Sequence, residues 1–146
     1  MNLLDVNVLL ALQWESHPHH AIAKTWYQAN SHKGWASCAL TQAGFVRISS
    51  QSSFESGGAT LADVARGLND FTTRSRHKFL SMDFDFEEVR RACTGRLFGH
   101  RQVADAFLLT LAIRHKIRFV SLDGGVAHLL ATDLERKRHL VILSTQ

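Results

Sequence analysis

The sequence predicts an α/β fold built on a mostly parallel sheet. Short apolar stretches typical of buried strands recur along the chain, and segments with helical spacing of apolar residues separate them. A hydrophobic fraction of 45% over 146 residues is enough for a sizeable core in one domain, which we expect to span residues 1–146. Strands that alternate with helices favour parallel pairing, because each helix returns the chain to the same end of the sheet.

The individual elements follow from local patterns. The apolar run after Met1 predicts a strand that leads directly into a helix, and Ser16 with Pro18 predicts the start of a second helix. Thr41 is predicted to open a helix after the stretch GWASCAL. In chain order we expect a strand at 2–5, a helix at 6–13, a helix from 16, a strand at 34–40, a helix from 41, a Ser- and Gly-rich loop at 50–60, helices near 60–74 and 85–97, a helix at 101–115, a strand at 117–123, a short helix near 125–131 and a strand at 140–144.

Composition restricts the classes of function. The formal charge of +4 and a pI of about 9.5 are compatible with a polyanionic partner such as nucleic acid, although many other proteins share them. Cys38 and Cys93 are far apart and form no Cys-x-x-Cys pair, which is typical of buried, reduced thiols in a cytosolic protein. No convincing signal peptide or membrane span is apparent, so we expect a cytoplasmic protein.

Three aspartates are placed where chemistry is expected. Asp5 ends the first predicted strand, and Asp123 ends the strand of the stretch RFVSLD. Ligands of an open parallel sheet bind at the carboxyl ends of its strands, so both acids should lie at the same edge. Asp105 shares its helix face with Leu108 and other apolar residues, so it should turn toward the core. The three acids are therefore predicted to converge at one end of the sheet.

A cluster of carboxylates indicates a site for a hard cation. Neighbouring carboxylates repel one another and raise each other's pKa, unless a divalent ion lies between them. Mg²⁺ and Mn²⁺ prefer oxygen ligands, and a metal-activated water can attack a phosphodiester. We therefore expect a metal site formed by Asp5, Asp105 and Asp123, in a hydrolase that acts on phosphodiesters.

Four segments of the chain resemble PIN-domain ribonucleases, and most closely the VapC-type toxins of bacterial toxin–antitoxin modules. These segments are LLDVNVLLAL at 3–12, TQAGFVRI at 41–48, RQVADAFLLTLAIRH at 101–115 and FVSLDGGV at 119–126. The resemblance covers essentially the whole chain, with the segments in the family's order. It implies a Rossmann-like α/β/α sandwich.

The resemblance also implies an activity and partners. The expected activity is that of an endoribonuclease toxin that depends on Mg²⁺, with Mn²⁺ as a substitute, and that stops translation by cutting an RNA. A cognate antitoxin would neutralise it, and the chain would form a homodimer. Asp5, Asp105 and Asp123 match the family's metal-binding acids. Asn7 matches a small polar residue that orients the site, and Thr41 is a second candidate for a supporting polar role.

The sequence departs from the family at one expected acid. Many relatives carry a glutamate in the segment that matches LTQAGF, and we assign Gln42 to that position, as a candidate catalytic residue. A glutamine amide can hold a water but cannot supply charge or act as a base. The chain is therefore either an active enzyme with weaker metal affinity or an impaired PIN module that binds RNA or antitoxin without cleavage. Gly124 and Gly125 follow Asp123 where relatives often carry a further acid. The sequence is therefore compatible with a site for one metal ion or for two.

Two further expectations concern the surroundings of the acids. Arg101 precedes Asp105 by one helical turn and is the best candidate to hold an RNA phosphate against carboxylate repulsion. An aspartyl-phosphate enzyme is a third hypothesis, because Asp5 follows an N-terminal strand. That class would want a second aspartate where Asn7 stands, so we disfavour it.

Overall fold

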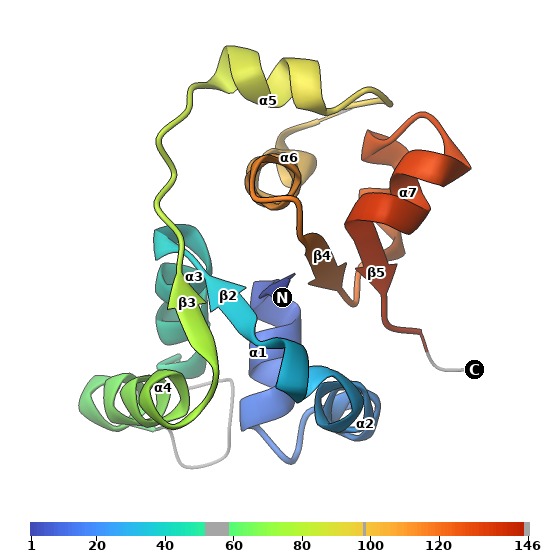
Figure 1. The fold of residues 1–146 in the computed structure, drawn as a ribbon. Coiled ribbons are helices and arrows are strands. Elements are labelled where there is room, and N and C mark those ends of the chain that lie inside the picture. Colours follow the sequence, from blue (N-terminus) through green and yellow to red (C-terminus); the bar gives the residue numbers. More distant parts are fainter. Residues whose placement is uncertain (52–58, 98, 145–146) are drawn as a thin grey trace.

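The computed structural model describes residues 1–51, 59–97 and 99–144, and a five-stranded sheet forms its centre (Figure 1). All strand pairs are parallel, in the order β3-β2-β1-β4-β5. The strands are β1 (Asn2–Leu4), β2 (Trp35–Ser37), β3 (His77–Phe79), β4 (Arg118–Ser121) and β5 (Leu140–Ile142). The predicted α/β fold with a mostly parallel sheet is therefore confirmed.

Helices connect successive strands and cover both faces of the sheet (Figure 1). The α-helices are α1 (Val6–Gln13), α2 (His20–Asn30), α3 (Ala39–Ser49), α4 (Leu61–Arg74), α5 (Phe86–Ala92), α6 (Val103–Arg114) and α7 (Asp133–His139). Three short 3₁₀ helices are η1 (Ser31–Lys33), η2 (His100–Gln102) and η3 (Gly124–Leu129).

Two hydrophobic clusters lie on opposite faces of the sheet. Leu3 and Phe119 belong to the cluster under α5 and α6, whereas Leu4 and Val120 belong to the cluster under α1 to α4. Neighbouring strand residues enter different clusters because successive side chains of a strand point to opposite faces. The result is the α/β/α sandwich that the resemblance implied, with its central strands buried on both sides.

Helices α2 and α3 begin at other residues than the sequence predicted, and α6 begins at Val103 instead of Arg101. Helix α2 begins at His20 instead of Ser16. Helix α3 begins at Ala39, before Thr41, which lies inside the first turn. The Thr41 hydroxyl accepts a hydrogen bond from the backbone N–H of Cys38 (3.0 Å) and donates one to the Cys38 carbonyl (3.1 Å). Thr41 therefore secures the start of α3 from within, in a fully buried position.

Helix α5 is shorter than the predicted span 85–97, because the chain turns away after Ala92 to meet η3. The backbone N–H groups of Gly95 and Arg96 donate to the carbonyls of Leu129 (2.9 Å) and His128 (2.8 Å). A Cβ atom at position 95 would overlap the His128 carbonyl oxygen, so this approach requires glycine.

Strand β3, helix α7 and the short η1 were absent from the sequence prediction. Strand β3 has three residues at the edge of the sheet, where half-exposed His77, exposed Lys78 and exposed Phe79 give no apolar alternation. Helix α7 has almost no apolar side chain, but a capping box of Thr132 and Glu135 stabilises its start. Residues 52–58 of the predicted loop lie outside the described residues.

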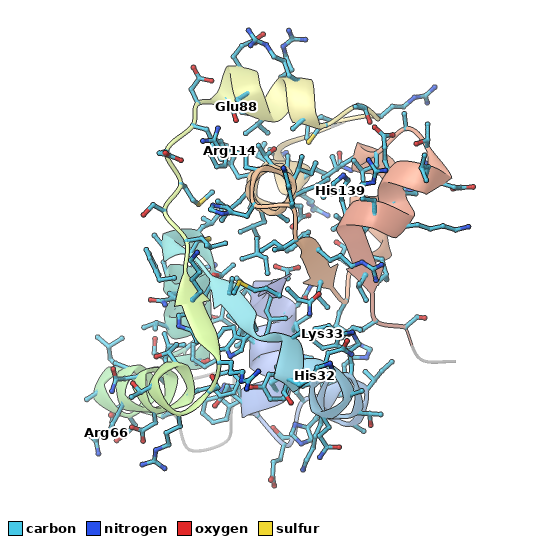
Figure 2. All side chains as sticks on the ribbon, viewed as in Figure 1. His32, Lys33, Arg66, Glu88, Arg114 and His139 are labelled. Atoms are coloured by element: carbon cyan, nitrogen blue, oxygen red, sulfur yellow. The ribbon has the colours of Figure 1, made fainter. Side chains whose placement is uncertain are left out.

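Polar contacts join the outer helices. Arg114 of α6 forms ion pairs with Glu88 of α5 and with Asp83, and Figure 2 shows Arg114 and Glu88 between the two helices. Cys38 and Cys93 are free, buried thiols, as predicted. Within the described residues, none of the helices has the length and hydrophobicity that a lipid bilayer would require.

Candidate acidic site

Asp5 lies at the junction between β1 and α1. Its backbone N–H pairs with the Val120 carbonyl of β4 (2.9 Å), and its Oδ1 caps α1 by accepting from the Val6 N–H (2.7 Å). The residue is 6% exposed. Burial raises the pKa of Asp5, and the hydrogen bonds from Ser121 and Val6 oppose this effect. A buried carboxylate with a raised pKa at a sheet edge is typical of a functional site.

Ser121 connects the polar residues of the site, and the sequence analysis missed it. Its hydroxyl donates to Asp5 Oδ2 (2.6 Å) and accepts from the Asn7 side-chain amide (3.1 Å) and the Asp123 N–H (3.0 Å). The Asn7 Oδ1 atom accepts from the Leu122 N–H (3.1 Å), so Asn7 orients the end of β4. The available signal was the position of Ser121 two residues before Asp123 in the predicted strand 117–123, because alternate residues of a strand share a face.

Asp123 and Asp105 complete the acidic group from two other elements. Asp123 lies two residues beyond the end of β4, where its Oδ1 caps η3 by accepting from the Gly125 N–H (2.7 Å). Half-buried Asp105 lies in the first turn of α6. Burial, followed by repulsion from Asp5 and Asp123, raises the pKa of Asp105 to about 7. The three carboxylates therefore interact electrostatically although they are far apart in the sequence.

A cavity of about 410 Å³ opens between α1, α3 and α6. Asp5, Asp105 and Asp123 line it together, as predicted from the sequence. Arg101 and Arg47 bring positive charge to the same cavity, and both side chains are exposed. The remaining lining residues are Val6, Asn7, Leu10, Leu40, Gly44, Ile48, Ala104 and Leu108. Acids, cations and apolar surface thus meet in one hollow.

The donor chemistry suits a hard divalent cation held partly through water. No three of the described His, Cys, Asp and Glu side chains lie close enough to form a ready-made metal site. Mg²⁺ nevertheless keeps several waters and needs only one or two direct carboxylates. Repulsion among the acids, visible in the raised pKa of Asp105, is relieved when such a cation enters. Asp5, Asp105 and Asp123 are therefore suitable ligands for a divalent cation, directly or through water.

Gln42 lies outside this cavity, contrary to the position that the sequence analysis gave it. Its side-chain amide donates to the Ser37 hydroxyl (2.9 Å), which also pairs with His77 Nε2 (2.8 Å). The face of α3 that lines the cavity carries Leu40, Gly44, Arg47 and Ile48. Gln42 is two residues from Gly44, so it projects from a different side of the helix. Thr41 is likewise occupied in capping α3.

The chain matches the family model described as "PIN domain" over residues 3–129. It belongs to the PIN-domain family. Within that family it groups with the VapC-type toxins. It is 44% identical over 126 residues to Ribonuclease VapC38 of Mycobacterium tuberculosis, which covers 86% of this chain and 87% of the relative. It is 40% identical over 141 residues to Ribonuclease VapC44 of the same species, and this match covers 97% of this chain and 98% of the relative.

Solved structures share the PIN fold at low sequence identity. "Structure of FitAB bound to IR36 DNA fragment" has a TM-score of 0.64 and 13% identity, and the match covers 100% of this PIN domain and 98% of that chain. A complex described as "VapBC2 from Rickettsia felis bound to a DNA fragment from their promoter" has a TM-score of 0.60 and 14% sequence identity, and the match covers 98% of each chain. These likenesses establish the fold.

Proposed function

We propose that this chain is a metal-dependent endoribonuclease toxin that hydrolyses phosphodiester bonds of RNA. One observation carries the proposal: Asp5, Asp105 and Asp123, from three separate segments, line one cavity, where burial and the charges of the other two acids raise the pKa of Asp105. The relatives at 38–44% identity bear the name ribonuclease, which supports RNA as the substrate. We further propose a cytoplasmic location and an RNA needed for translation as the target.

Asp5, Asp105 and Asp123 are the proposed metal-holding residues. A bound Mg²⁺ or Mn²⁺ would supply Lewis-acid chemistry, by activating water and by offsetting phosphoryl charge. Ser121 holds the Asp5 carboxylate in a fixed orientation, because its hydroxyl is itself held by Asn7 and by the Asp123 N–H. Such supporting contacts keep ligand atoms in place while substrate enters.

The two arginines that line the acidic cavity have a role separate from that of the acids. A phosphodiester that approaches three carboxylates meets repulsion, and Arg101 of η2 and Arg47 of α3 line the same cavity and would counter it. Arg101 precedes α6 and Arg47 lies in α3, so an RNA strand between these elements would contact both. Gln42 takes no part in this proposal, because its amide is engaged with Ser37.

The test is cleavage of tRNA and ribosomal RNA by the purified protein in Mg²⁺, Mn²⁺ or EDTA. We expect discrete products from the wild type with metal, and none from Asp105→Asn or in EDTA. Equal products from the wild type and Asp105→Asn would indicate a contaminating nuclease. If neither cleaves any RNA offered, while the wild type still binds Mn²⁺ and RNA, the impaired module would replace the active toxin as the conclusion.

An antitoxin partner and a homodimer are further parts of the proposal. The names VapBC2 and FitAB describe solved assemblies of proteins with this fold, which supports a protein partner. Co-expression with the product of an adjacent small gene should give a complex that elutes as one peak and has lost cleavage. Sedimentation of the toxin alone should give twice the mass of 16.4 kDa; a value of one chain would contradict the dimer.

A further inference from the structure

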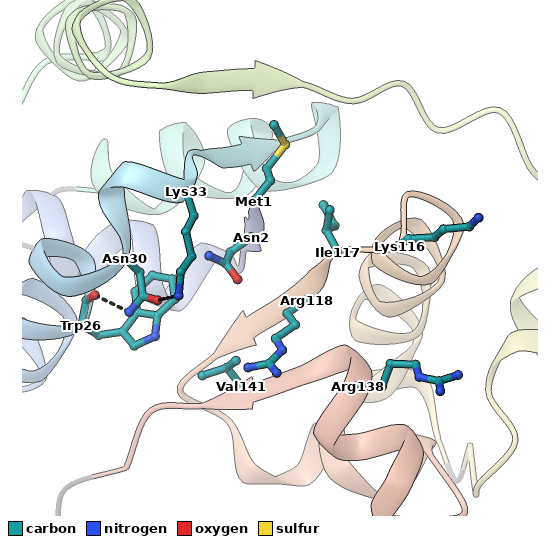
Figure 3. A pocket seen from close by; sticks show the side chains of 10 residues that line it. All are labelled: Met1, Asn2, Trp26, Asn30, Lys33, Lys116, Ile117, Arg118, Arg138 and Val141. Atoms are coloured by element: carbon teal, nitrogen blue, oxygen red, sulfur yellow. Dashed lines mark hydrogen bonds between the residues drawn. The ribbon is translucent and has the colours of Figure 1, made fainter.

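A second cavity, of about 390 Å³, lies at the opposite edge of the sheet from the acids (Figure 3). Asn2 and Arg118, at the starts of β1 and β4, pair in register and both line it. Lys33 lines it from η1, which directly precedes β2. In a parallel sheet all amino ends meet at one edge, so this cavity and the acidic one are on opposite sides of the central strands.

The charge of this cavity is entirely positive. Its described lining includes four cationic side chains, Lys33, Lys116, Arg118 and Arg138, and no Asp or Glu. Elsewhere in the described chain, several cations are paired with acids, in the ion pairs of Arg66, Arg90, Arg91, Arg114 and Arg136. Cations gathered without a counter-charge repel one another, and a bound anion removes that cost.

Polar and aromatic groups complete the cavity. Lys33 Nζ donates to the Asn30 Oδ1 atom (2.9 Å), and the Asn30 amide donates to the Trp26 carbonyl (2.9 Å), so Lys33 is held over the opening. Asn2 is 7% exposed, and its side chain forms no hydrogen bond with any residue that the structure describes. Figure 3 shows the Asn2 amide between Lys33 and Arg118. Among the described side chains only His139 Nδ1 is both shielded from solvent and without a hydrogen-bond partner, so the Asn2 amide faces the cavity and is available to a ligand there.

We propose that this basic cavity binds phosphate groups of an RNA strand, at a site separate from the acidic one. Lys33 and Arg118 contact the phosphates, and the Asn2 amide donates to a phosphate oxygen. Half-buried Trp26 in the same lining gives a base an aromatic surface, a combination typical of single-strand binding. The choice of RNA over a free anion rests on the proposed function, whereas the cavity and its charge do not.

Binding can be measured without cleavage, in EDTA, by the fluorescence anisotropy of a labelled single-stranded RNA titrated at several salt concentrations. Each phosphate contact contributes about 0.7 to the slope of log K against log salt for a single strand. Lys33→Gln with Arg118→Gln should weaken binding and make the slope less steep by about 1.4. The charge-matched control, Arg66→Gln with Arg74→Gln on exposed α4, should leave the slope unchanged.

Three outcomes would overturn the proposal. The first is an unchanged slope in the Lys33/Arg118 variant, and the second is an equal fall in the α4 control. The third is that the Lys33/Arg118 variant loses inorganic phosphate binding, measured by calorimetry, but retains RNA binding, since this would identify a small-anion site. Lys33→Arg with Arg118→Lys keeps the charge and should retain the wild-type slope. Because no cleavage is required, failure of the nuclease assay and failure of this proposal are distinguishable.

Discussion

The Ser121 hydroxyl donates a 2.6 Å hydrogen bond to Asp5 Oδ2, and so links the ends of the two central strands, β4 and β1. The same oxygen accepts from Asn7 and from the Asp123 N–H. Three candidate site residues therefore depend on one hydroxyl group that has no apparent chemical role of its own. A substitution at Ser121 therefore disturbs the orientation of the site's carboxylates without removing their charge.

Replacing Ser121 with alanine removes all three hydrogen bonds while every carboxylate remains. The buried Asp5 carboxylate then loses a donor, which should lower the free energy of unfolding by about 1–3 kcal/mol. Metal affinity should fall by about 10- to 100-fold, as is typical when a supporting contact to a metal ligand is lost. Urea unfolding and calorimetric Mn²⁺ titration measure the two effects. The control is Ser81→Ala at an exposed position; equal behaviour of the two variants would contradict the role of Ser121.

The ionisation of Asp105 should make the metal-free protein less stable as pH rises. Its pKa is about 7 in the folded chain, against 3.8 for an unperturbed aspartate, so between these values the folded state binds the extra proton. The contribution is full below about pH 4 and is lost as pH passes 7. Asp105→Asn should flatten this part of the curve of unfolding free energy against pH, measured in EDTA from about pH 5 to 8. Parallel curves for the two proteins would refute the assignment.

Arg101 should act on RNA and not on the metal. Its side chain is exposed at the rim of the acidic cavity, so Arg101→Gln should leave the unfolding free energy and Mn²⁺ affinity nearly unchanged. The KM for RNA should rise several-fold, because one favourable phosphate contact is lost. Steady-state kinetics with a defined RNA substrate provide the measurement. A fall in kcat with no change in KM would assign Arg101 to the chemical step instead.

The close approach of α3 to α1 depends on Gly44. A Cβ atom there would lie 2.7 Å from Val6 Cγ2, and a valine in a helix has little freedom to rotate away. Gly44→Ala should therefore destabilise the protein by about 1–3 kcal/mol, despite the better helix propensity of alanine. Gly44→Ala combined with Val6→Ala should cost less than the sum of the single changes. Additive effects in this double-mutant cycle would show that Val6 is not the obstacle.

The sequence predicted the parts of the fold that have strong apolar patterns. Helix α1 was predicted at its observed bounds, and Asp5, Asp105 and Asp123 were correctly placed in one cavity. Strand β3 escaped prediction because an exposed edge strand of three residues has no alternation to detect. The family segment assigned Gln42 a position in the sequence, but the side of α3 that faces the cavity depends on where the helix begins, and Gln42 is not among the lining residues.

The registers of the sheet also bear on how the chain acquires its structure during synthesis. Among the described strands β1 is made before the other four, yet it occupies the middle of the sheet, and Asn2 pairs with Arg118. Contacts between such distant residues form late, because a long segment must first be available. A nascent chain that has not yet exposed β4 carries Asp5 but lacks Ser121, Asp123 and the Val120 carbonyl that fix it. The acidic site therefore cannot form during synthesis until β4 has left the ribosome.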